Sequence, residues 1–134
     1  MIYFIIGASG SGKSSCCKYL KTLLSNYTIY DFDDIVVPSN PDKKWRQEAT
    51  EKWIKQLTAN NDSSNFCLVG QMVTGEILAA PSAQHLTNIN IYFLDCSDWV
   101  RIQRLKIRGT HGVNQVTLSW SAMPYQFLYF REAL

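Results

Sequence analysis

The 134-residue sequence lacks any long hydrophobic run and carries little net charge. A membrane-spanning helix needs about 18 or more consecutive apolar residues, and no stretch approaches that length. The formal net charge of +2 is too small to indicate binding to nucleic acid or to an acidic membrane surface. The first residues also lack the basic leader and cleavage site of a secretory signal. We therefore expect neither a nucleic-acid partner nor a membrane partner.

Cysteine is scarce and is not spaced for metal binding. The four cysteines form no C-x-x-C pair, and the two histidines do not stand at metal-ligand spacing from them. Disulfides are rare in the cytosol, so reduced and buried thiols are the simplest interpretation. We expect a cytoplasmic protein without a structural zinc site. The cysteines are Cys16, Cys17, Cys67 and Cys96.

Hydrophobic runs of strand length alternate with segments of helical period, which indicates one α/β domain over residues 1–134. Asn40 followed by Pro41 predicts the start of the second helix, and Ser97 predicts the cap of the last one, which would end at Gly109. Alternating strands and helices need crossover connections, so the sheet should be mostly parallel, with helices on both faces. We expect strands at 2–6, 27–30, 66–69 and 89–94, and helices at 13–25, 41–59, 75–80 and 97–109.

The first expected strand runs directly into a glycine-rich and serine-rich loop. The spacing Gly7-x-x-x-x-Gly12-Lys13-Ser14 is the Walker A pattern, and it stands between a strand and a helix as that pattern requires. Such a loop points several backbone N–H groups at a phosphate, beside the positive end of the helix. Lys13 would reach the β- and γ-phosphates, and the Ser14 hydroxyl would bind Mg²⁺. The expected nucleotide-binding residues are Gly7, Ala8, Ser9, Gly10, Ser11, Gly12, Lys13, Ser14 and Ser15.

Three aspartates follow the second expected strand, in the stretch "YDFDD". Ligands of open α/β sheets bind at the carboxyl ends of the strands. Asp31 and Asp33 would point to one side if the strand continued. Asp31 would then hold a Mg²⁺-bound water, and Asp33 would orient or deprotonate an acceptor hydroxyl. The alternative is a solvated turn in which these aspartates cap the next segment.

The last expected helix carries Arg101, Arg104 and Arg108 on one face. Guanidinium groups beside a nucleotide can neutralise charge on a phosphoryl group during transfer. The alternative is a solvated basic face, which the negative end of a helix favours. The expected apolar face of the same helix consists of Trp99, Ile102 and Leu105.

Two motifs of other nucleotide-binding classes are absent. No Asn-Lys-x-Asp occurs, which counts against a regulatory GTPase. The third expected strand ends at Gly70-Gln71 without an acidic residue, so the Walker B carboxylate of ATP-driven machines is missing from its usual place. Asp95 follows the fourth strand, which is one strand too far.

With these motifs the sequence resembles the small P-loop kinases of metabolites and nucleotides, the adenylate-kinase, shikimate-kinase and gluconate-kinase superfamily. The matching stretches are 7–14, Asp31-x-Asp33 and Arg104-x-x-x-Arg108, and the likeness covers residues 1–112. Stretches similar to "DFDDI", "WRQ", "GQ" and "RGTHG" also recur in bacterial proteins labelled as P-loop or AAA-family ATPases.

The resemblance implies a three-layer P-loop NTPase fold with a sheet of four or five strands. It also implies ATP and Mg²⁺ as cofactors, and transfer of the γ-phosphate to a metabolite, nucleoside or nucleotide. The alternative is a nucleotide-binding module or a slow ATPase that has no acceptor. We expect a monomer or a homodimer, with a lid near 104–120. Only 26 residues follow Arg108, so the C-terminal part of the fold would be abbreviated.

The expected roles divide into three groups. Lys13, Asp33, Arg104 and Arg108 would be catalytic, and Ser14 and Asp31 would hold the metal. Arg46 and Gln71, together with Asp33, would bind the acceptor, with Glu76 as a further candidate. For Arg46 the alternative is an ordinary exposed arginine, and for Glu76 it is a charge at a helix start.

Overall fold

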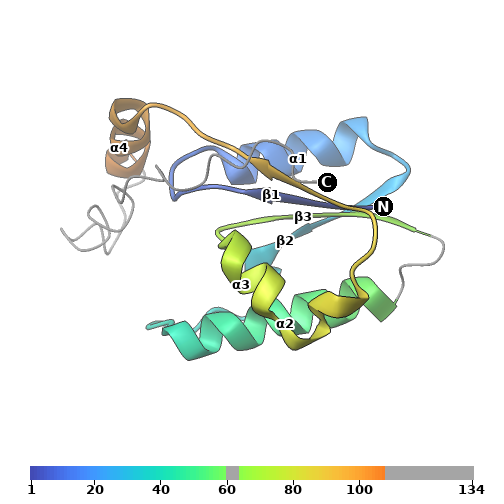
Figure 1. Ribbon diagram of the computed structural model, residues 1–134. Helices are drawn as coiled ribbons and strands as arrows, with labels where there is room; N and C mark the ends of the chain where they lie inside the picture. Colours follow the sequence, from blue (N-terminus) through green and yellow to red (C-terminus); the bar gives the residue numbers. More distant parts are fainter. Residues whose placement is uncertain (60–63, 108–134) are drawn as a thin grey trace. The chain divides into compact units, whose positions relative to one another are not determined.

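The computed structural model describes residues 1–59 and 64–107 (Figure 1). The chain divides into two compact units, Met1–Asp95 and Cys96–Leu134. A parallel four-stranded sheet with the order β2-β3-β1-β4 forms the first unit's centre. Its strands are β1 (Ile2–Ile6), β2 (Tyr27–Asp31), β3 (Asn65–Gly70) and β4 (Ile89–Phe93). The predicted α/β fold with a parallel sheet is confirmed.

Helices connect these strands, as their alternation predicts. The first unit holds α1 (Lys13–Leu23), α2 (Lys43–Ala59), α3 (Thr74–Ala79) and the 3₁₀ helices η1 (Phe32–Asp34) and η2 (Pro81–His85). The second unit holds α4 (Asp98–Ile107). Most of the expected lid and the expected helix end at Gly109 lie outside the described residues. None of the described helices is long and apolar enough to span a membrane.

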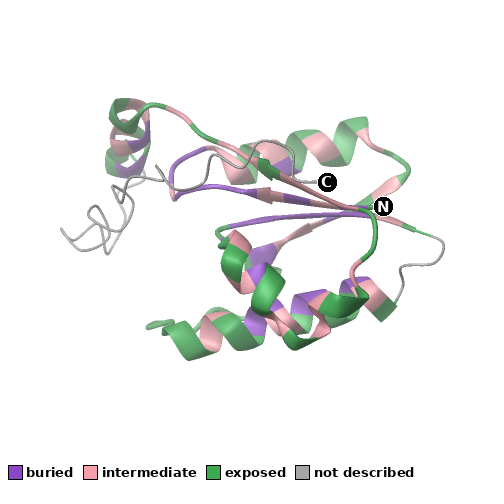
Figure 2. Ribbon diagram, viewed as in Figure 1, coloured by how far each residue is buried: buried purple, intermediate pink, exposed green. Residues whose placement is uncertain are grey.

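Helices cover both faces of the sheet, because side chains alternate along each strand. On one face, Phe4 of β1 and Leu68 of β3 pack with Ile54 of α2 and Ile77 of α3. On the other face, Cys67 and Val69 of β3 pack with Cys17 of α1 and Ile29 of β2. Figure 1 shows α1 on one side of the sheet and α2 with α3 on the other, and Figure 2 shows that β3 is buried along most of its length. The sheet thus lies between two layers of helices, which is the expected three-layer arrangement.

The register brings the carboxyl ends of the four strands to one edge. Ile6 of β1 pairs with Gly70 of β3 and Phe93 of β4, and Asp31 of β2 pairs with Val69 of β3. The segments that leave the strands at this edge are therefore neighbours, although they are far apart in the sequence. They contain the glycine-rich loop, the aspartates and Gln71.

The second helix begins later than its predicted cap. Asn40 was expected to cap it and Pro41 to open it, but the helix starts at Lys43. The Asp42 carboxylate accepts a 2.7 Å hydrogen bond from the Trp45 backbone N–H. This bond satisfies a backbone donor that the first turn of a helix leaves unpaired, so Asp42 is the cap.

All four cysteines are free thiols, and the expected burial is found for two of them. Cys17 and Cys67 are buried, while Cys16 and Cys96 are partly buried. Burial raises the pKa of the Cys67 thiol to about 12. Thiolate is the reactive form, so Cys67 is an inert packing residue.

Gly70 is required by close packing. A Cβ atom at this position would stand 2.2 Å from Cβ of Phe32, the buried first residue of η1. Cβ of Phe32 is attached to the backbone, so it cannot swing away as the end of a flexible side chain can. The end of β3 and the aspartate turn are thus packed directly against each other.

We expect Gly70→Ala to lower the free energy of unfolding by about 1–3 kcal/mol, because the added methyl group overpacks this contact. Gly75→Ala in α3 is the matched control. A Cβ at position 75 meets no atom within 4 Å, and alanine is the better helix former. Urea denaturation of both variants measures the effect. Equal stability of the two variants would contradict the close approach of β3 and η1.

Candidate functional site

The loop between β1 and α1 has the backbone geometry of a phosphate-binding turn. Gly10 and Gly12 have φ angles of 81° and 105°, a left-handed conformation that glycine adopts without strain. The Ser11 N–H donates to the Ala8 carbonyl at 3.2 Å, and the Cys16 N–H donates to the Gly12 carbonyl at 2.9 Å, which begins the helix. The predicted strand, loop and helix are confirmed here.

The Lys13 side chain folds back over this loop. Its ammonium group donates to the Ala8 carbonyl at 2.5 Å, so its charge lies beside the loop's backbone and not in open solvent. The pKa of the Asp33 carboxyl is raised by desolvation and by Asp31, and the positive charge of Lys13 partly opposes this shift. The structure thus brings two of the predicted catalytic residues together.

A buried hydroxyl in the loop tests whether the site fits a phosphate. Ser11 is 5% exposed, and its Oγ has no hydrogen-bond partner among the described residues. A Cβ at Gly7 would stand 2.7 Å from this Oγ and 2.4 Å from the Leu94 carbonyl oxygen, so the loop is closely packed around it. A buried hydroxyl without a partner is costly. A phosphate oxygen would supply the missing acceptor, so the residues fit an anion.

The residues expected to hold Mg²⁺ follow β1 and β2 at the same edge of the sheet. Ser14 is exposed at the start of α1, and the aspartates of the turn follow β2. In the described part of the chain no group of three or more histidine, cysteine or acidic side chains could hold a metal by itself. Mg²⁺ commonly keeps several waters and takes one or two carboxylates together with nucleotide phosphates, so this small donor set fits it.

The aspartates form a capped turn and do not continue the strand. β2 ends at Asp31, and the Asp33 N–H donates to Asp31 Oδ1 at 3.0 Å. The Asp31 N–H donates to Asp34 Oδ2 at 3.1 Å, which completes a reciprocal capping box. The expectation that Asp31 and Asp33 share one side of a continuing strand is wrong, because the two hydrogen bonds of this capping box stabilise the turn into η1. The capping alternative describes the geometry correctly.

Partial desolvation and like charges raise the pKa of the Asp33 carboxyl, although the residue keeps exposed surface. Desolvation is the largest cause, and the negative charges of Asp31 and Asp34 add to it, while Lys13 opposes them. A raised pKa means that this carboxylate holds a proton more readily than an ordinary aspartate. Perturbed carboxyls of this kind are common among catalytic bases.

Aromatic packing fixes the position of the turn. The Trp53 indole N–H of α2 donates to the Phe32 carbonyl at 3.1 Å. Trp45, also of α2, meets the Phe32 ring edge-on, with the ring centroids 6.4 Å apart. Neither contact is encoded locally, because both partners lie on another element. The capping box, by contrast, does have a local signal, because the sequence places Asp34 three residues after Asp31.

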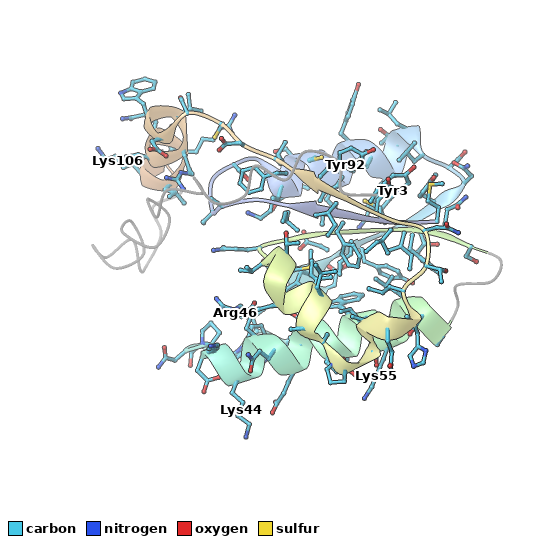
Figure 3. All side chains as sticks on the ribbon, in the orientation of Figure 1. Tyr3, Lys44, Arg46, Lys55, Tyr92 and Lys106 are labelled. Atoms are coloured by element: carbon cyan, nitrogen blue, oxygen red, sulfur yellow. The ribbon has the colours of Figure 1, made fainter. Side chains whose placement is uncertain are left out.

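The structure joins two of the candidate acceptor residues in an ion pair. Nε and Nη2 of Arg46 donate to Glu76 Oε1 at 3.2 and 2.9 Å. Figure 3 labels Arg46 on α2. Arg46 is therefore not the ordinary exposed arginine of the alternative. Gln71 follows β3 at the ligand edge and is exposed.

The two described arginines of α4 differ in burial. Arg101 is 3% exposed and donates to Asp98 Oδ1 at 2.6 Å, whereas Trp99, which was expected on the apolar face, is 71% exposed. The bond from Arg101 to Asp98, one turn earlier, offsets part of this charge, while Nε of Arg101 has no hydrogen-bond partner among the described residues. Arg104 is exposed and donates to the Cys96 sulfur at 3.8 Å. Arg108 lies outside the described residues.

Solved structures with this fold include three that act as useful references. A chain of the Pnkp1/Rnl/Hen1 RNA repair complex has a TM-score of 0.72 and 15% identity, over 94% of this chain and 44% of that chain. Shikimate kinase from Acinetobacter baumannii has a TM-score of 0.62 and 18% identity, over 96% and 77%. A gluconokinase from Sinorhizobium meliloti has a TM-score of 0.66 and 16% identity, over 89% and 71%.

At these identities the similarity shows the fold alone, which is that of the small P-loop kinases. The chain spans less than half the length of the RNA-repair chain. The sequence has no match among curated proteins. It does match the AAA_18 family, described as AAA domain, over residues 4–116, a span that contains the glycine-rich loop, the aspartate turn and α4. The chain belongs to this AAA domain family.

Proposed function

We propose that the protein binds ATP with Mg²⁺ and transfers the γ-phosphate to a small-molecule acceptor. The observation that carries this proposal is the juxtaposition of Lys13, folded over the loop, with a carboxyl of raised pKa at Asp33. A phosphate-binding loop alone would account for nucleotide binding. A proton acceptor beside it adds what a hydroxyl needs in order to attack phosphorus.

Each group in the loop has a role in holding the nucleotide. The N–H groups of residues 7–15 and the buried Ser11 hydroxyl bind phosphate oxygens, and Lys13 neutralises their charge. The Ser14 hydroxyl would hold Mg²⁺. Asp31 Oδ1 already accepts the Asp33 N–H, so its other carboxylate oxygen is the one proposed for a Mg²⁺-bound water. The metal supplies charge neutralisation on the phosphates when it is bound.

Asp33 takes the proton from the acceptor hydroxyl as the reaction proceeds. The hydroxyl oxygen forms a bond to the γ-phosphorus, and the bond from that phosphorus to the bridging oxygen breaks, which leaves ADP. For Arg104 and Arg108 the proposal keeps the role expected from the sequence, which is to neutralise charge on the transferring group. Gln71 and the Arg46–Glu76 pair bind the acceptor. Positioning and electrostatics supply most of the rate, as in phosphoryl transfer generally.

A nucleotide-binding module without an acceptor is the second candidate. The observation that favours it is the capping box, because Asp31 and Asp34 have a structural role whether or not catalysis occurs. Acceptor-dependent release of ADP separates the two functions, since only a kinase needs the acceptor.

We expect Lys13→Ala to weaken the binding of Mg·ATP by about 10- to 100-fold, because it removes a charge-assisted contact to phosphate. Isothermal titration calorimetry measures the affinity. Lys18→Ala is the matched control, since Lys18 is an exposed lysine of the same helix. The loop has no nucleotide role if both variants bind like the unchanged protein.

We expect Asp33→Asn to lower kcat by about 10²- to 10⁴-fold, because asparagine cannot accept the proton. The affinity for Mg·ATP should stay within about threefold, since the carboxylate is assigned to the acceptor and not to the phosphates. A coupled assay of ADP release with sugars, nucleosides and small acids gives kcat, and calorimetry gives the affinity. An unchanged kcat with a good acceptor would show that Asp33 does not accept the proton of the acceptor hydroxyl.

The pKa of Asp33 should respond to its neighbours in opposite directions. Asp31→Asn keeps the capping oxygen but removes a negative charge, so the pKa should fall. Lys13→Ala removes the opposing positive charge, so the pKa should rise. Carboxyl ¹³C NMR over a pH titration measures both shifts, with Asp42→Asn as the control. Shifts of the same sign in both variants would refute this electrostatic account.

A further inference from the structure

An ion pair joins the first turns of α2 and α3 at the ligand edge of the sheet. Two nitrogens of Arg46 donate to one oxygen of Glu76, and the side chains are 30% and 14% exposed. The carboxylate in direct contact offsets the charge of the guanidinium. A negatively charged ligand approaching Arg46 therefore also meets Glu76, which repels it.

The second oxygen of Glu76 is left without a protein partner. Oε2 is buried and accepts no hydrogen bond from any residue of 1–59 or 64–107. An unsatisfied buried carboxylate oxygen is costly, and only a hydrogen-bond donor relieves that cost. A ligand hydroxyl is such a donor, whereas a ligand carboxylate or phosphate is not. The pair therefore favours a ligand group that donates a hydrogen bond to Oε2 over a ligand carboxylate or phosphate.

Packing connects this pair to the aspartate turn. Arg46 directly follows Trp45, whose ring meets that of Phe32, and Phe32 lies between Asp31 and Asp33 in the chain. The turn itself brings three carboxylates together. With Arg46 neutralised by Glu76, the three carboxylates of the turn leave the acceptor side of the site with an excess of negative charge. Such a field disfavours acidic acceptors.

We propose that the phosphoryl acceptor is an uncharged polyhydroxy compound, a sugar or the ribose of a nucleoside. Glu76 determines this specificity by neutralising Arg46 and by accepting a hydrogen bond from an acceptor hydroxyl through Oε2. The inference rests on the proposed phosphotransfer and adds the class of acceptor to it.

Glu76→Gln tests the proposal, because it removes the neutralising charge and keeps the side-chain shape. ADP release is measured with two matched pairs of acceptors, sorbitol against gluconate and ribose against ribonate. The unchanged protein should prefer the neutral member of each pair. In Glu76→Gln the ratio of neutral to acidic turnover should fall about tenfold, because an unpaired guanidinium now attracts the acid.

Two further variants separate charge balance from a structural role. The double variant Arg46→Gln with Glu76→Gln is again neutral, so its ratio should return to within about threefold of the original value. Glu51→Gln is the matched control, because Glu51 has a similar side-chain exposure of 18% but binds Ser82 and Lys55. It should leave the ratio unchanged. Should Glu76→Gln fail to fold, Arg46→Gln alone should widen the preference for neutral acceptors by about tenfold.

The outcomes distinguish this inference from the function on which it rests. A protein that binds ATP and phosphorylates the acids faster than the neutral compounds is a kinase, but the inference is overturned. The same holds if Glu76→Gln and Glu51→Gln have equal ratios. If no acceptor of either class accelerates the release of ADP, the proposed transfer is overturned. The inferred acceptor class is then overturned as well.

Discussion

The parallel pairing of β1 with β3 and β4 is the constraint on which the rest of the molecule depends. It sets Ile6 opposite Gly70 and Phe93, so the chain leaves these strands at one edge and at one level. The glycine-rich loop therefore has the aspartate turn and Gln71 as neighbours. Without that register, Lys13 and Asp33 would be two polar residues 20 positions apart in the sequence. With it, they share an electrostatic environment.

Packing beneath this edge holds the polar groups in place. Trp53 and Trp45 of α2 and Gly70 of β3 all contact Phe32, which is buried. Phe32 therefore anchors the aspartate turn to the core, while Asp33 and Asp34 keep exposed surface. A site built in this way combines a rigid frame with charged groups that water and ligands can reach.

Local signals account for what the sequence predicts well. The strand, loop and helix around Lys13 are contiguous, and glycine spacing dictates the backbone there, so motif and structure agree. The error at the second helix arose because Asn40 and Asp42 are both good cap residues, and it is Asp42 that accepts the hydrogen bond from the Trp45 N–H. The aspartate turn was open to two interpretations, and the deciding bonds are between backbone and side chains of the turn itself.

Tertiary contacts account for what the sequence could not predict. Arg46 and Glu76 are 30 residues apart, and nothing in their local sequence indicates that they pair. Helical spacing placed Arg101 in a polar row, yet its bond to Asp98 allows it to be buried while Trp99 is exposed. Periodicity identifies the faces of a helix, but it does not determine which face the surroundings cover.

The central claim is that backbone amides of the loop after β1 bind the phosphates of a nucleotide. The most direct measurement is a titration of ¹⁵N-labelled protein with Mg·ATP, followed through the assigned amide resonances. The account requires the largest shifts at Gly10, Ser11, Gly12, Lys13 and Ser14, with smaller ones at Asp33. Saturating Mg·ATP that leaves the amides of these loop residues unmoved would contradict it.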